Sequence, residues 1–226
     1  MRLPRTLGEL DDLVSEADVS GRGLQLTERL LRAADSMPHG EESLRAEMLV
    51  AAAEGLSLSG QPQRAVAAAQ AAVADGGPVR HDARTHLAAA LRGAGRDEEA
   101  RATLREVWRS RPRAPGLHLF AGEQSEAIGD HAEALRWYTR GLSIAENKVG
   151  DEEAEVTCML MLIARLRTRR ALALPPDDWD LAAVEAVESA RRVVEATEMG
   201  DCDCPCGHGA VISEEDDAIF IDLVRA

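Results

Sequence analysis

Four residues with the chemistry of soft-metal ligands stand close together near the end of the chain. Cys202, Cys204, Cys206 and His208 alternate with other residues. Thiolate and imidazole groups suit Zn²⁺ and, less well, Cu(I). Clustered cysteines in a reducing compartment are more often metal ligands or redox thiols than disulfides. The cluster therefore predicts a zinc site, with a redox-active or an inert cysteine-rich turn as the alternatives.

A shared ion would require this segment to bend. Side chains two residues apart on an extended strand are separated by about 6.5 Å, which is too far for ligands of one tetrahedral ion. Pro205 and Gly207 lie between the ligands, and both residue types favour turns. Cys158 lies in an apolar run instead, and we expect it to pack in a helix core.

The sequence carries none of the common catalytic motifs. His-Glu-x-x-His, Gly-x-Ser-x-Gly, a phosphate-binding loop and a dinucleotide fingerprint are all missing. His39, His81, His86, His118 and His131 are scattered over the expected helix ends and turns, where surface histidines are ordinary. We therefore expect a protein that is not an enzyme.

One basic run stands out in the second half of the chain. It consists of Arg165, Arg167, Arg169 and Arg170, and it follows Arg136 and Arg140 of the preceding helix pair. The run is expected to be a solvated helix end, where positive charge favours the C-terminal dipole. The alternative is a docking site for an acidic peptide or a phosphorylated group.

The elements that position these residues are indicated by a repeated turn. Residues 60–65, 95–100 and 129–134 each begin with glycine and end with alanine, and the closing alanines are 35 and 34 residues apart. A fixed period of this length is typical of helix-turn-helix solenoids. The glycine ends one helix and the alanine lets two helices touch closely. We therefore expect Ala65, Ala100 and Ala134 to be buried.

These motifs resemble those of the tetratricopeptide (TPR) family. The resemblance implies an all-α, right-handed helical solenoid, with helix pairs at roughly 46–79, 81–112 and 115–147. An earlier pair fits between Leu7 and Pro38 and would cap the array. The resemblance also implies that the concave surface binds a protein or a peptide.

The predicted concave surface has a mixed charge. TPR proteins that grip a C-terminal carboxylate use Lys, Arg and Asn on the inner face of the first helix of each pair, and that clamp is missing here. The inner positions instead carry Glu47, Glu54, His86, Arg92, Glu123 and Glu126. These residues suit a basic or apolar partner better than an anionic terminus.

After residue 149 the repeat pattern ends. Two further helices are predicted in 150–199, one over 153–174 and one over 179–198 that Asp177 or Asp178 caps. Both would cover the open end of the superhelix. Residues 200–226 hold the cysteine cluster and two short β-prone runs, which predict a β-hairpin. The expected units are thus 1–149, 150–199 and 200–226.

The cysteine-rich tail adds a second resemblance. Residues 204–209, Cys-Pro-Cys-Gly-His-Gly, look like the opening half of the SEC-C motif, whose closing Cys-Cys or Cys-His pair is absent here. With residues 136–142 and 175–179, the chain is similar to bacterial TPR proteins that carry SEC-C motifs. The resemblance implies Zn²⁺ as the cofactor of the tail.

Composition narrows the partners and the compartment. The formal net charge is −14, and nucleic acids and anionic membranes both require local positive charge on their ligands. No apolar run approaches the roughly 18 residues of a membrane helix, and the first residues lack a signal-like segment. We expect a cytoplasmic protein that binds neither nucleic acid nor membrane.

Together these observations predict a non-catalytic adaptor that binds a protein or peptide on its concave surface. The alternative is a metal- or redox-responsive regulator, in which the cysteine-rich tail is the sensor and the solenoid is the effector surface.

Overall fold

The computed structural model describes residues 4, 6–19, 21–38, 44–145, 152–185 and 187–188, and all regular secondary structure in these ranges is helical. In chain order the helices are α1 (Leu7–Val19), α2 (Gly23–Ser36), α3 (Arg45–Leu58), α4 (Pro62–Asp75), α5 (Ala83–Gly93), α6 (Asp97–Arg109), α7 (Pro115–Ala127), α8 (His131–Ala145) and α9 (Glu152–Ala171). Further helical residues occupy 178–185 and 187–188. The predicted all-α class is confirmed for these ranges, whereas the predicted hairpin in 200–226 lies outside them.

The repeated glycines end helices in the same way each time. Gly60, Gly95 and Gly129 have φ values of 68°, 72° and 81°, which is the left-handed region that glycine adopts without steric cost. After each of them the next backbone N–H donates to the carbonyl five residues earlier, at 2.9 Å in all three turns. This bond satisfies a carbonyl at the helix end and reverses the chain direction.

Consecutive helices pack as pairs at the positions of the small residues. α3 packs on α4, α5 on α6, and α7 on α8. Ala65, Ala100 and Ala134 are 0% exposed, as the repeat predicts. In the third pair Gly122 of α7 faces Tyr138 of α8, and a Cβ atom on Gly122 would lie 2.3 Å from the Tyr138 Cε1 atom. The absence of a side chain at Gly122 therefore makes room for a buried aromatic ring.

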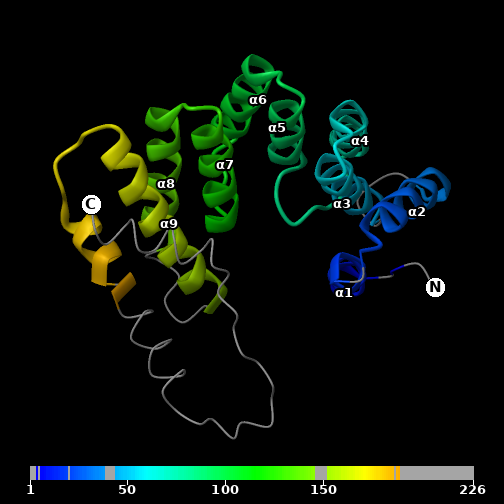
Figure 1. Cartoon of the computed structure of the whole chain (residues 1–226), viewed down its shortest axis with the longest axis horizontal. Helices are drawn as coiled ribbons and strands as arrows, with labels where there is room; N and C mark the ends of the chain where they lie inside the picture. Colours follow the sequence, from blue (N-terminus) through cyan, green and yellow to red (C-terminus); the bar gives the residue numbers. More distant parts are fainter. Residues whose placement is uncertain are drawn as a thin grey trace, which may run out of the picture.

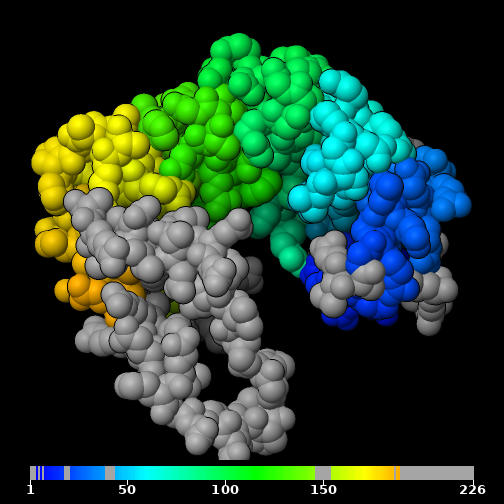
Figure 2. Space-filling view, in the orientation of Figure 1, coloured from blue at the N-terminus to red at the C-terminus, as the bar shows by residue number. Residues whose placement is uncertain are grey.

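The helix pairs follow one another along an arc (Figure 1). Each odd-numbered helix contacts the next one, from α1 to α3, α5, α7 and α9. These helices form the inner side of the arc, and α4, α6 and α8 lie toward its outer side (Figure 1). Figure 2 shows that the inner side is hollowed between the blue N-terminal helices and the green helices of the middle of the chain.

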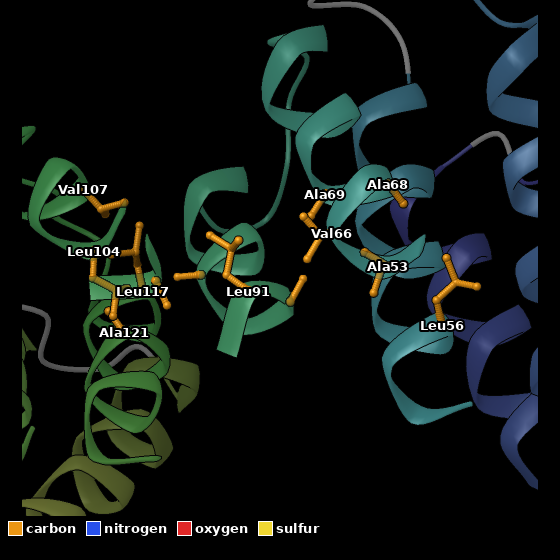
Figure 3. Packing of buried hydrophobic residues seen from close by; sticks show 14 of the residues in the cluster. Ala53, Leu56, Val66, Ala68, Ala69, Leu91, Leu104, Val107, Leu117 and Ala121 are labelled. Atoms are coloured by element: carbon orange, nitrogen blue, oxygen red, sulfur yellow. The ribbon is translucent and has the colours of Figure 1, made fainter. Parts of the chain in front are cut away.

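The core runs along the array of pairs. Leu56, Val66, Leu91, Leu104 and Leu117 belong to one buried cluster that joins three pairs (Figure 3). Its members are mostly aliphatic, since only 3% of the chain is aromatic. Trp137 and Tyr138 are the bulkiest fully buried side chains in the described ranges. Both residues therefore pack in the core.

The chain after α9 begins its next helix with a reciprocal cap. The Asp180 N–H donates to Asp177 Oδ1 at 3.1 Å, and the Asp177 N–H donates to Asp180 Oδ2 at 3.0 Å. This arrangement satisfies two backbone donors that a helix start leaves without partners. Asp177 is thus the cap that the sequence predicts. None of the helices in the described ranges has both the length and the apolar character needed to cross a bilayer.

Candidate binding surface on the inner side of the arc

The six predicted binding residues lie on three neighbouring inner helices. Glu47 and Glu54 belong to α3, His86 and Arg92 to α5, and Glu123 and Glu126 to α7. The spacings of seven and three residues place the pairs of α3 and α7 each near one helix face, whereas six residues separate His86 from Arg92 by about 120° around α5. α3 contacts α5 and α5 contacts α7, so the three helices that carry these residues are neighbours.

Glu54 and His86 form a direct contact between α3 and α5. The His86 Nδ1 and Glu54 Oε1 atoms are 2.9 Å apart. The side chain of Glu54 is 55% exposed, whereas that of His86 is 9% exposed. The imidazole therefore holds an accessible carboxylate at a fixed place on the inner side.

Glu47 supplies a second carboxylate on α3, seven residues before Glu54. Its Oε2 atom accepts a hydrogen bond of 3.0 Å from the Arg80 backbone N–H, and the Arg80 guanidinium forms an ion pair with Asp11 of α1. Burial raises the pKa of Glu47, and the nearby charge of Glu54 raises it further. The α4–α5 connection is thereby tied to both α1 and α3.

Three rings lie next to the carboxylates. The ring centroids of His86 and Phe120 are 5.0 Å apart. The His81 ring centroid lies 6.2 Å from each of these two centroids. The sequence reasoning missed His81 and Phe120. Phe120 could have been found, because it lies three residues before Glu123 and so shares its face of α7. His81 could not, because it reaches the rings from the connection between α4 and α5.

Arg92 and Glu123 continue the surface toward α7. The Arg92 Nε atom donates to Gln124 Oε1 at 3.1 Å, which links α5 to α7. Glu123 is exposed, and partial desolvation of its carboxyl group raises its pKa. Glu47 and Glu54 of α3 and Glu123 of α7 thus lie on the two helices that flank α5.

Glu126 is held by contacts within the protein. Its two carboxylate oxygens accept hydrogen bonds of 2.7 and 2.6 Å from Arg167 of α9, and Oε2 also accepts one of 3.0 Å from the Tyr138 hydroxyl. Burial alone would raise the pKa of Glu126, but the bonds and charge of Arg167 outweigh it and lower the pKa. Among the predicted residues, Glu126 thus joins α7, α8 and α9.

Two histidines differ from the expectation of surface positions. His86 is 8% exposed and His118 is 0% exposed. His118 Nδ1 lies 2.9 Å from the Ala114 carbonyl oxygen, and the His118 ring packs 5.5 Å from that of Trp137. Burial lowers the pKa of His118. The expectation was wrong for both because each faces the neighbouring helix and not the solvent.

The basic run on α9 is exposed to solvent only in part. Arg165 is buried and donates to Asp177 at 2.9 and 2.6 Å and to Asp180 at 3.1 Å. Its guanidinium carbon also lies 4.7 Å from the centroid of the Trp179 ring. Arg169 pairs with Asp180 at 2.9 Å. The expectation of a solvated run was therefore wrong for Arg165, which joins α9 to the helix that follows.

The predicted metal ligands Cys202, Cys204, Cys206 and His208 lie outside the described residues. Within the ranges that the structure covers, no group of three or more His, Cys, Asp or Glu side chains is arranged to hold an ion. Cys158 is half-buried and packs beside the cluster of Tyr138 and Leu142, in line with the expected packing role.

Comparison of the chain with protein-family models, with curated proteins and with solved structures finds no match in any of the three.

Proposed function

We propose that the helices form a TPR-like, right-handed superhelix in which 1–149 is the repeat array and 150–199 covers its end. Three findings support this architecture: the period of 34 to 35 residues, the identical helix-ending turns, and the buried alanine at the same place in three pairs. Contacts between successive odd-numbered helices support it further, since they give the array a continuous inner side.

On this architecture the protein is a non-catalytic adaptor that binds a protein or peptide partner on its inner surface. The observation that carries the proposal is the carboxylate of Glu54, held by His86 beside the ring of Phe120. Carboxylates next to aromatic faces favour a peptide that alternates basic and apolar side chains. Neither nucleic acid nor membrane fits an inner surface with these carboxylates.

Selection from a displayed peptide library followed by affinity measurement tests the proposal. We expect the selected peptides to be rich in lysine, arginine and apolar residues. The double variant Glu54→Lys/Glu123→Lys should weaken their binding by about tenfold or more, because both attractive charges become repulsive.

The matched control is Asp35→Lys/Glu106→Lys, which makes the same charge change at exposed positions of α2 and α6. This control should bind the selected peptides almost as the wild type does. Selected peptides of acidic composition, or an equal loss of affinity in both double variants, would contradict the inner surface as the binding site.

A further inference from the structure

Basic side chains that have no ion-pair partner in the described ranges lie close together in sequence on α6 and in the loop after it. Residues 105–113 contain four arginines and one glutamate, in a chain whose formal net charge is −14. Arg105, Arg109, Arg111 and Arg113 are exposed, and none of them forms an ion pair with a residue in the described ranges. These four guanidinium groups are therefore available to an anion from outside the described part of the chain.

Other arginines of the same helix pair form ion pairs within the protein. Arg84, Arg96 and Arg101 each pair with a carboxylate of their own neighbourhood, at 2.5 to 2.6 Å. The charges of these three guanidinium groups are thus neutralised locally. The C-terminal half of α6 and the loop after it are an exception.

Trp108 joins this basic segment to α8. The guanidinium carbons of Arg136 and Arg140, one turn apart on α8, lie 4.9 and 4.8 Å from the centroid of the Trp108 ring. Trp108 is half-buried and packs edge-on against the buried Trp137, with the centroids 4.7 Å apart. The core thereby fixes the indole that both arginines contact.

The two stacked arginines can still bind an anion. A guanidinium that lies against an aromatic ring directs its N–H donors outward in its own plane. Arg136 shares its donors with Glu133 at 2.7 Å, whereas Arg140 forms no ion pair with a described residue. Stacking also restricts the side chain before binding, which reduces the entropy that an incoming carboxylate must overcome.

We propose that this surface, formed by Trp108 with Arg105, Arg109, Arg113, Arg136 and Arg140 and named here the Trp108 surface, binds an acidic peptide segment of a partner protein. Glutamate and aspartate side chains match the two-pronged geometry of arginine. The surface lies on α6, the loop after it and α8, away from the inner helices, and its partner has the opposite charge to the one proposed for the inner surface. The protein would then hold two partners at once, one on each side of the arc.

A short acidic segment fits better than a nucleic acid. The basic patch is local, and the chain carries 40 aspartate and glutamate residues against 26 lysine and arginine residues. A long polyanion would extend beyond the patch and be repelled by the rest of the molecule, whereas a short peptide would stay within it.

Fluorescence anisotropy with the full-length chain tests the proposal. The probe is a fluorescein-labelled peptide of alternating glutamate and serine, used at low ionic strength. Arg136→Gln/Arg140→Gln should weaken its binding by about five- to tenfold, and so should Arg109→Gln/Arg113→Gln, whose side chains are exposed and form no ion pair with a described residue.

The matched control is Arg32→Gln/Arg64→Gln, which removes the same charge from exposed positions on α2 and α4. Its affinity for the probe should change by less than about twofold. No binding by the wild type, or an equal loss in the control variant, would overturn the proposal.

Two further binding measurements test for other ligands of the Trp108 surface. If a single-stranded oligonucleotide of equal charge binds more tightly than the peptide and is lost in the same variants, the surface takes nucleic acid and the proposal is wrong. If Glu214→Gln/Glu215→Gln/Asp216→Asn/Asp217→Asn raises the affinity for the probe about tenfold, the occupant is this chain's own acidic segment. That result would overturn the assignment to a partner protein.

Discussion

At the scale of single residues, Gly122 decides how closely α7 approaches α8. A Cβ atom there would lie 2.3 Å from Cε1 and 2.7 Å from Cδ1 of Tyr138. The ring cannot move away from an added methyl group without cost, because Tyr138 is fully buried and its hydroxyl donates to Glu126. Adding one methyl group must therefore move the helices or break this hydrogen bond.

Gly122→Ala should lower the free energy of unfolding by about 1–3 kcal/mol, because the added methyl group overpacks the contact. Urea unfolding followed by circular dichroism measures this change. Gly93→Ala is the matched control, since a Cβ atom on this helical glycine meets nothing within 4 Å. The control should be neutral or more stable by about 0.5–1 kcal/mol. Equal stability of the two variants would contradict the packing of Gly122 against Tyr138.

Single residues also show where sequence reasoning succeeded. The burial of Ala65, Ala100 and Ala134 was predictable because the repeat puts a small residue at the same place in each turn. The burial of His118 was not, because its polar ring gives no sign that Trp137 lies beside it. A pattern along the chain shows the size that a position tolerates but not its neighbour across the interface.

At the scale of elements, α9 is joined to the next helix by charge. Arg165 and Arg169 reach Asp177 and Asp180, the two residues that cap that helix. The hydrogen bond from Arg165 is the main cause that lowers the pKa of Asp177, to about 2. The cap and the ion pairs thus share the same carboxylates.

This link predicts a pH dependence of stability. Because the pKa of Asp177 is lower in the folded chain than the usual value of about 3.9, its carboxylate stabilises the fold above about pH 4. The stabilisation is lost as the pH falls toward 2. Asp177→Asn should therefore be less stable than the wild type at neutral pH, and the difference should shrink between about pH 4 and pH 2.

Urea unfolding midpoints measured across that range provide the test. Asp178→Asn is the control, because Asp178 is exposed and forms no ion pair with a residue of the described ranges. This control should be close to the wild type throughout. A difference between the wild type and Asp177→Asn that stays constant from pH 7 to pH 2 would show that the ionised carboxylate contributes nothing.

Elements also show what a sequence can and cannot predict about a binding surface. The turns between α3 and α4, α5 and α6, and α7 and α8 could be predicted from the repeated glycine and alanine positions, because local turn chemistry sets them. The partners of Arg165 and Arg167 did not, since they lie 12 to 41 residues away and depend on how helices pack. The Trp108 surface was missed for the same reason, although Arg136 and Arg140 were noted as a pair.

At the scale of the whole molecule, the predicted zinc site in the cysteine-rich tail would make the proposed adaptor responsive to metal. If Cys202, Cys204, Cys206 and His208 share one ion, protein purified without chelator should contain about one zinc per chain. Cys204→Ser/Cys206→Ser should contain almost none. Because a solenoid repeat contacts mainly its neighbours, the helicity of 1–147 should be the same in both proteins.

Elemental analysis beside circular dichroism decides this prediction. A zinc content near zero in the wild type, or equal contents in the two proteins, would remove the metal site. The adaptor function would then be independent of the tail.

The proposed binding of a partner peptide by the inner helices also involves the whole arc. The most direct measurement is photo-crosslinking of a selected peptide to the full chain, with the crosslinked residues identified by mass spectrometry. We predict crosslinks on α3, α5 and α7, near Glu54, His86 and Phe120. Crosslinks confined to α4, α6 and α8 would contradict the claim and place the partner on the outer side.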